Sequence, residues 1–493
     1  MFFLRDNYFL LLILTFASII QANGINKPFI GHHDYNSAWH ATAARNLERY
    51  GLVSTKFASV MNTDTQDKSK FGFYTHYPPL VPILIYPAFK VFGVHDWSLR
   101  LVPVLVTLTT IFLIYKTASR FFSKQIGLTA AAISAVLPLV IYYGKIPTHD
   151  LFALPFVLLS INFYFDFFSE KSKKNSTKLV TTLILAHLTH WSGYYLTPIL
   201  FLHYLLFSKT RRKLLTSLMF PTLSLIMFLS HLLQTTWATA SPVGGGLIDI
   251  FLGRLNLKDQ LEGYSILNFF TTQARYLIIY YTRPVLFFSA LTCLLILVKI
   301  IRNKLDQKSS VLLILLIFGL AHGLIFRNIS FIHDYIITSL WPFFALATSF
   351  GFFKFLEYLR VKTFLPQITI AIVLLATILI ERAEFTRVLK ATTHFKDGVY
   401  VGQIIASVTK SGEKSLILSP DFKKYYEVFT NYYADRLIEY EIPPKRQLEK
   451  AILDKEYKLI IAFPKRDTPP EYVILLENYS KPTKTNDLII FKI

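Results

Sequence analysis

The 493-residue chain has a single cysteine, Cys293, and only 17% of its residues are charged. One cysteine excludes intrachain disulfides and cysteine-rich metal sites. Soluble globular proteins average about 25% charged residues, so the scarcity of charge argues against a soluble protein. The C-terminal residues 382–493 also lack GxGxxG, P-loop and HExxH motifs, and the sequence therefore assigns no nucleotide or metalloprotease chemistry to that part of the chain.

Hydrophobic residues make up 53% of the chain, aromatic residues 16%, and the mean hydropathy is +0.42. Because a helix needs about 20 mostly apolar residues to cross a bilayer, we searched for apolar runs of that order. The fold class predicted is mainly α: a polytopic membrane protein of about eleven transmembrane helices. The expected spans are 8–22, 98–117, 126–143, 150–168, 179–191, 193–207, 214–233, 276–300, 310–326, 332–353 and 364–381.

The distribution of the net charge of +21 predicts the orientation of these spans. Residues 382–493 contribute only +4, and no basic stripe remains that would bind nucleic acid. Cytoplasmic loops are rich in Lys and Arg, so alternate loops rich in these residues are assigned to the cytoplasm. These cations are Lys116, Arg120, Lys124, Lys171, Lys173, Lys174, Lys178, Lys209, Arg211, Arg212, Lys213, Lys299, Arg302, Lys304, Lys308, Lys354, Arg360 and Lys362. We expect a cell-membrane protein with a cytoplasmic N-terminus, which carries Arg5, and an extracytoplasmic C-terminus. The alternative interpretation of the first apolar run is that it is a cleaved signal peptide and not a membrane span.

Two regions outside the membrane are predicted to be structured. The first outer loop, about 23–97, contains a helix over 36–50 that Gly51 terminates and an apolar stretch over 80–92 that lies in the interface. The tail, 382–493, alternates charged helical segments with short β-rich runs, which indicates a small α/β domain. The expected strands are Ser415–Leu418, Leu459–Ala462, Val473–Leu476 and Leu488–Phe491.

Three acidic residues stand at the outer ends of predicted spans, where ionisable groups are costly and usually functional. Asp34 precedes the 36–50 helix, Asp150 begins the fourth span in KIPTHDLF, and Asp334 begins the tenth in SFIHDY. For Asp34, a helix-capping role and a functional role are equally compatible with the pattern. For Asp150 alone, the pattern favours an N-cap. Three acids at outer span starts are expected to converge on one outer cavity.

Histidines collect on the same side of the predicted membrane. His33 and His40 are not spaced as ligands on one helix, and no HxxxH or paired cysteines support a metal site. The sequence therefore predicts no cofactor, with a divalent metal as an alternative that is possible but not indicated. The histidines concerned are His32, His33, His40, His76, His149, His190 and His333.

Further motifs follow one another in order along the chain: FYTHYPPLVP at 73–82, VFGVHDWSLRLVP at 91–103, THDLFALPF and HDYIITSLWPF. Together with the acid after the first span and the helix ending in Gly51, this succession resembles the GT-C membrane glycosyltransferases. The most similar branch holds the dolichyl-phosphate-mannose protein mannosyltransferases and the aminoarabinose lipid A transferases. The likeness covers residues 1 to 355.

The resemblance implies transfer of a sugar from a polyprenyl-phosphate donor to a glycan, lipid or protein acceptor at the outer membrane face. It implies Asp34 as the catalytic general base and Asp150 as a second catalytic acid beside the acceptor. Cations near the outer ends of late spans are candidates for binding the donor phosphate: Arg275, Arg283, Arg327 and His333. The expected substrate-cavity residues are His33, Tyr35, His76, Tyr77, His149 and Tyr335.

Two positions depart from the family pattern. Tyr35 stands where many members have Glu, and Tyr77 stands where many have a Lys before the two prolines, so a cation for the phosphate must come from elsewhere. The alternative class is a polytopic transporter or flippase, which predicts internal repeats or broken helices near the midplane. The sequence shows no convincing repeat, and its informative acids cluster at the outer ends of the spans. A metal-dependent oligosaccharyltransferase would need a motif such as WWDYG, which is absent.

Overall fold

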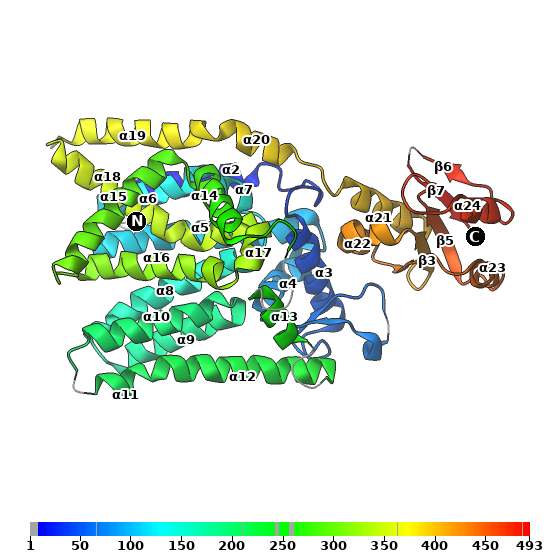
Figure 1. The fold of residues 1–493 in the computed structure, drawn as a ribbon, viewed down its shortest axis with the longest axis horizontal. Coiled ribbons are helices and arrows are strands. Elements are labelled where there is room, and N and C mark those ends of the chain that lie inside the picture. The colour runs from blue at the N-terminus through cyan, green and yellow to red at the C-terminus, as the bar shows by residue number, and fades with distance from the viewer. Residues whose placement is uncertain are drawn as a thin grey trace.

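The computed structural model describes residues 8–65, 67–210, 212–241, 246–255, 261–361, 363–485 and 487–493. It shows a large helix bundle with a smaller sheet-containing unit at one end (Figure 1). Within the described residues, six helices are long and apolar enough to cross a membrane. The predicted fold class, mainly helical and membrane-spanning, is confirmed, while the number of eleven spans stays a prediction. Arg5, Arg211 and Lys362, which entered the charge pattern, lie outside the described residues.

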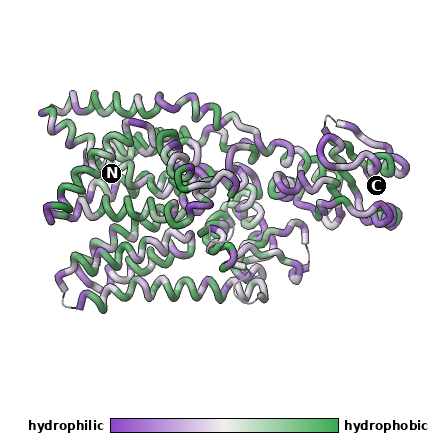
Figure 2. The backbone as a smooth tube through the Cα atoms, viewed as in Figure 1, coloured by the Kyte–Doolittle hydropathy of each residue, from purple (hydrophilic) through white to green (hydrophobic). Residues whose placement is uncertain are grey.

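The bundle follows the predicted apolar runs closely, and Figure 2 shows hydrophobic residues along its helices. Its helices are α2 (Tyr8–Ala22), α5 (Asp96–Phe121), α6 (Lys124–Val136), α7 (Pro138–Tyr143), α8 (His149–Ser169), α9 (Lys173–Thr189), α10 (Ser192–Phe207), α11 (Lys213–Ser217), α12 (Met219–Thr239), α14 (Ile266–Tyr281), α15 (Arg283–Ile301), α16 (Gln307–Ile325), α17 (Arg327–Ile332), the 3₁₀ segment η3 (Asp334–Leu340), α18 (Trp341–Tyr358) and α19 (Phe364–Glu381).

Three expected spans are broken, each beside a proline. The run 126–143 forms α6 and α7, because Leu137 before Pro138 is extended, as proline requires of the residue before it. The run 276–300 divides at Thr282, which has φ +66°, just before Pro284 in the first turn of α15. The run 332–353 begins with η3, and Pro342 then stands in the first turn of α18. These breaks lie beside the functional residues described below.

The first outer loop forms the helices that the sequence predicts. Helix α3 (Tyr35–Tyr50) ends at Gly51, whose φ of +80° suits glycine, and α4 covers Leu80–Phe92. The loop also contains β1 (Ser59–Val60), η1 (Lys68–Lys70) and β2 (Phe73–Tyr74), and α13 (Leu247–Arg254) comes from the segment between α12 and α14. Helices α3, α4 and α13 lie together at the end of the bundle nearest the C-terminal unit (Figure 1).

The C-terminal region forms a five-stranded sheet in the order β4-β3-β5-β7-β6, in which β3, β4 and β5 are parallel. Its strands are β3 (Lys414–Leu418), β4 (Leu437–Tyr440), β5 (Tyr457–Ala462), β6 (Thr483–Lys484) and β7 (Ile489–Lys492). Its helices are α20 (Ala383–Ala391), α21 (Lys396–Val408), α22 (Pro420–Ala434), α23 (Lys445–Leu453) and α24 (Pro470–Glu477). The predicted strand Val473–Leu476 is wrong: it belongs to α24, which begins at Pro470, a residue suited to the first turn of a helix.

The C-terminal unit packs against α3 of the outer loop. Arg45 donates a hydrogen bond of 2.8 Å to the carbonyl of Tyr432 and forms a 3.1 Å ion pair with Asp435. Phe29 and three alanines of α3 share one hydrophobic cluster with Val399, Phe429 and Tyr432. These contacts join the tail to the loop that carries Asp34.

Candidate functional site

Asp34 is buried and ion-paired with a residue of α5. The residue is 5% exposed, and both carboxylate oxygens lie 3.2 Å from Nη2 of Arg100, which is itself 4% exposed. The backbone N–H of Gly31 donates to Oδ2 at 2.9 Å, and the hydroxyl of Ser37 donates to Oδ1 at 3.0 Å. Asp34 is the residue before α3, but its side chain makes no capping bond to that helix. Both oxygens of the Asp34 carboxylate therefore already accept hydrogen bonds from neighbouring groups.

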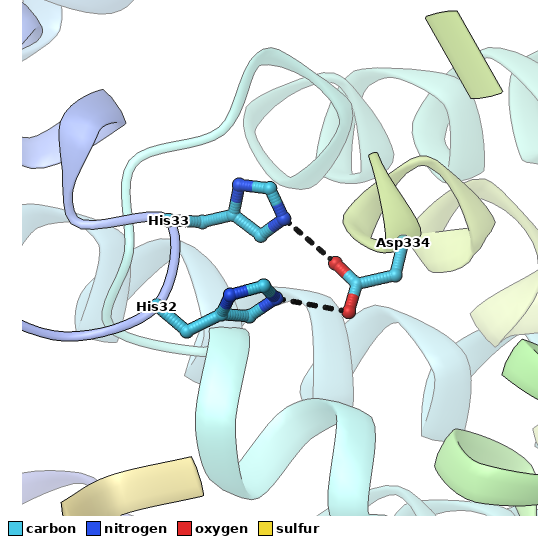
Figure 3. A group of neighbouring side chains, drawn as sticks. All are labelled: His32, His33 and Asp334. Carbon is cyan, nitrogen blue, oxygen red and sulfur yellow. Dashed lines mark hydrogen bonds and ion pairs between the residues drawn. The ribbon is translucent and has the colours of Figure 1, made fainter. Parts of the chain in front are cut away.

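Asp334 connects the outer loop to the late membrane helices. Its carboxylate oxygens lie 3.1 Å from Nε2 of His32 and 2.9 Å from Nε2 of His33, and Figure 3 shows both imidazoles pointing at it. The phenols of Tyr143 and Tyr280 each donate to the same carboxylate at 2.5 Å. Four groups therefore surround this carboxylate, which fixes the turn before Asp34 against η3.

Two groups of described residues have donor atoms suited to a divalent metal. One is His32, His33 and Asp334, and the other is Asp150, His190 and His322; in each group the possible ligand atoms lie within 4.8 Å of one another. In the first group, the two phenols and two imidazoles already supply donors to the carboxylate. The expectation that no metal is needed stays a prediction.

A cavity of about 180 Å³ brings together most of the residues predicted to contact substrate; we call it the Asp150 cavity. It lies where α3, α8, α13, α17 and η3 meet near β2. Asp150, His333 and five of the six predicted substrate-cavity residues line it. The lining residues are His33, Tyr35, Asn36, Trp39, His40, Tyr74, Tyr77, His149, Asp150, Arg254, Ile329, His333 and Tyr335. The sixth predicted residue, His76, lies beside the cavity, and the centre of its ring is 4.2 Å from that of Tyr74, which lines it.

Arg254 and Tyr77 form one wall of the Asp150 cavity. The guanidinium carbon of Arg254 lies 4.6 Å from the centre of the Tyr77 ring, and this ring stacks on His149 at 4.2 Å. Asp150, 3% exposed, accepts a hydrogen bond of 2.9 Å from Ser339 at Oδ1. A carboxylate with one oxygen bonded to a side-chain donor thus shares a small cavity with a guanidinium.

The electrostatics of this cavity depend on Arg254. Burial and the nearby charge of Arg254 lower the pKa of His76 to about 4, and burial lowers the pKa of His40 well below its ordinary value. Burial also lowers the pKa of His33, against the opposing effect of Asp334. These imidazoles are therefore neutral at pH 7. Among the described lining residues, Arg254 is the one Lys or Arg.

The three arginines predicted to bind the donor phosphate do not line the Asp150 cavity. Arg275 and Arg327 are exposed on α14 and at the start of α17. The side chain of Arg283 is 79% exposed, and its Nε lies 3.8 Å from Glu381. Asp34 lines a different cavity, and Asp334 contacts His33 in the wall of the Asp150 cavity without lining it. The expectation that the three outer acids converge on one cavity is therefore wrong. Their proposed roles remain predictions.

The sequence did not single out Arg254, Trp39 or Tyr74 as site residues. Arg254 counted only as one charge in a long outer loop, and its position at the end of the short helix α13 became meaningful once α13 packed beside α17. The available signal was Tyr77, which stands where many family members have a lysine. Without that lysine, a cation for the phosphate has to come from another segment.

The fold and motifs have counterparts among known proteins. The computed structure is similar to ArnT from Cupriavidus metallidurans in the apo state, with a TM-score of 0.66, 11% identity, and coverage of 99% of this chain and 98% of that one. ArnT bound to undecaprenyl phosphate gives a TM-score of 0.61 at 11% identity, with 98% of each chain covered. The Archaeoglobus fulgidus oligosaccharyltransferase in complex with Zn and sulfate gives 0.58 at 12% identity, covering 94% of this chain and 69% of that one.

This chain is therefore a multi-pass membrane protein with the GT-C glycosyltransferase fold, and the resemblance seen in its sequence is confirmed. Within that class, residues 76–234 match the family model described as dolichyl-phosphate-mannose-protein mannosyltransferase. The matched segment includes Tyr77, Arg100 and Asp150. No curated protein sequence matches the chain.

Proposed function

We propose that this protein transfers a sugar from a polyprenyl-phosphate donor to an acceptor at the outer face of the membrane. The observation that carries the proposal is the Asp150 cavity, in which a buried carboxylate and the guanidinium of Arg254 share one space at the ends of membrane helices. The family match and the similarity to an ArnT that binds undecaprenyl phosphate support a lipid-phosphate donor. The donor sugar is a hexose or a pentose, and the acceptor is a glycan, a lipid or a protein.

The chemistry is an inverting displacement. The acceptor hydroxyl attacks the anomeric carbon, the bond from that carbon to the phosphate oxygen breaks, and the electron pair leaves with the lipid phosphate. A carboxylate takes the hydroxyl proton, and a general base of this kind contributes about 10²–10⁴ in rate. Negative charge grows on the leaving phosphate, and we assign its stabilisation to Arg254, because this guanidinium lines the cavity.

Two carboxylates are candidates for the base. Asp34 is implied by the family resemblance, but Arg100, Ser37 and the Gly31 N–H already occupy both of its oxygens. Asp150 faces the cavity that contains Arg254, and a single side-chain hydroxyl bonds to it. We therefore place the base at Asp150 and assign Asp34 to holding the loop that precedes α3.

The proposal includes a topology. The N-terminus is cytoplasmic, residues 1–381 form the catalytic membrane domain, and residues 382–493 form an extracytoplasmic domain. The contacts between Arg45 and the Tyr432–Asp435 segment support it, because they put the tail on the same side as the first outer loop.

Arg254→Gln tests the proposed role of the cavity in phosphate stabilisation. We expect kcat for transfer from a purified polyprenyl-phosphate sugar to fall by about 10²–10³, because removing one electrostatic contact to a developing oxyanion has that effect. The assay measures release of the lipid phosphate together with the glycosylated acceptor, with and without a chelator. Arg275→Gln is the matched control, since Arg275 is exposed, and it should turn over normally. Equal activity of the two variants would remove Arg254 from the mechanism.

A further inference from the structure

A second cavity, of about 260 Å³, lies on the Asp34 side of the outer loop; we call it the Asp34 cavity. It is lined by the loop after α2, the start of α5, the end of α7 with the turn that follows it, and the end of α20. Four cationic side chains line it: Lys27, Arg100, Lys145 and Lys390. Asp34 is the one acid among the described residues that line this cavity. None of these lining residues also lines the Asp150 cavity.

Among the described residues, no carboxylate forms an ion pair with the lysines of this cavity. Asp34 is held by Arg100, as described above. Lys145 donates to the carbonyl of Asn23, and the side chain of Lys390 has no hydrogen-bond or ion-pair partner among the described residues. Burial and the charges of Lys390 and Arg100 lower the pKa of Lys145 to about 8, and burial together with Lys27 lowers that of Lys390. An anion in the cavity would relieve this repulsion.

The Asp34 cavity continues into an apolar space. An adjoining cavity of about 480 Å³ is lined by Lys27 and Lys390 as well, and its other walls include Pro138, Ile141 and Leu379. Leu379 belongs to α19, an apolar helix with exposed side chains along its length: Leu365 is 74% exposed and Ile380 is 71% exposed. A ligand that fills both spaces needs an anionic head beside the lysines and an apolar chain along α7 and α19.

We propose that the Asp34 cavity binds the phosphate headgroup of a membrane lipid, at a site separate from the one that holds the sugar donor. A lipid fits better than a free anion because the two cavities share Lys27 and Lys390 and lead from a basic chamber to α19, an apolar helix with exposed side chains. The site does not depend on sugar transfer, and the inference stands or falls independently of the proposed function.

The experiment compares lipid binding by three full-length proteins in detergent, using native mass spectrometry with added phosphatidic acid. The site variant is Lys145→Gln/Lys390→Gln. The matched control is Lys396→Gln/Lys481→Gln, which removes the same charge from exposed positions. We expect the site variant to bind phosphatidic acid about 30-fold more weakly, since each lysine near an anionic headgroup contributes about 1 kcal/mol. The control variant should bind like the unchanged protein.

Two further measurements keep the outcome decisive. Thermal unfolding without added lipid should show the site variant at least as stable as the unchanged protein, because two half-buried lysine charges that repel the other cations of the cavity are gone. Inorganic phosphate at the same concentration should not displace phosphatidic acid. Unchanged lipid binding by the site variant overturns the proposal, and so does full displacement by inorganic phosphate, which would define a free-anion site.

Discussion

An Asp150→Asn variant is expected to lose sugar transfer by a factor of about 10²–10⁴, the contribution of a positioned general base. The substitution keeps the shape of the side chain and keeps an acceptor for the Ser339 hydroxyl, which lies 2.9 Å from Oδ1. It removes the ability to take a proton. Because Arg254 and Tyr77 are unchanged, the variant should still bind the lipid-phosphate donor.

The measurement is kcat at saturating donor and acceptor, together with donor affinity and the pH dependence of kcat. A general base must be deprotonated to act, so activity of the unchanged enzyme falls as the pH is lowered, and the residual activity of Asp150→Asn should not follow that decline. Ser339→Ala provides the control, because it removes one hydrogen bond and leaves the carboxylate. Turnover of Asp150→Asn close to that of the unchanged enzyme would exclude Asp150 as the base.

Much of the fold is predictable because bilayer-crossing helices need long apolar runs and end at recognisable residues. The predicted bounds of α2 and α4 agree with the structure, and α3 ends at the expected Gly51. The breaks at Leu137 and Thr282 were missed, because an apolar run looks continuous while a nearby proline ends the helix locally. In the tail, the run after Pro470 was read as a strand, although it is short and apolar enough for either structure.

Site residues could be predicted where they stand in motifs of the sequence. A site residue that belongs to no motif, and reaches the site from a distant segment of the chain, could not. Tyr77 and His149 stand in motifs typical of the fold, and they stack in the structure. Arg254 reaches Tyr77 from 177 positions further along the chain, a pairing that no spacing rule gives. Arg275 stands at the outer end of a predicted span, as a phosphate-binding residue would, and its position along the chain did not tell that it is exposed on α14 and does not line the cavity.

The second large effect is expected from breaking the buried ion pair between Asp34 and Arg100. Asp34→Asn leaves the Arg100 guanidinium buried without a counter-charge, and breaking a buried pair in this way costs about 3–5 kcal/mol. Arg100 also donates to the carbonyls of Ile25, Lys27 and Pro28, so the pair holds the loop that carries His32 and His33. We expect a lower unfolding temperature and a loss of transfer.

Arg100→Gln and the double variant separate the two roles that Asp34 can have. If Asp34 acts by holding the loop, Asp34→Asn and Arg100→Gln should lose stability and turnover in parallel. The double variant should then be destabilised by less than the sum of the two, because neither charge is left unpaired. Turnover is measured per folded molecule, with folding followed by thermal unfolding in detergent. A well-folded Asp34→Asn protein without turnover, beside an active Arg100→Gln protein, would instead return the catalytic base to Asp34, as the family resemblance implies.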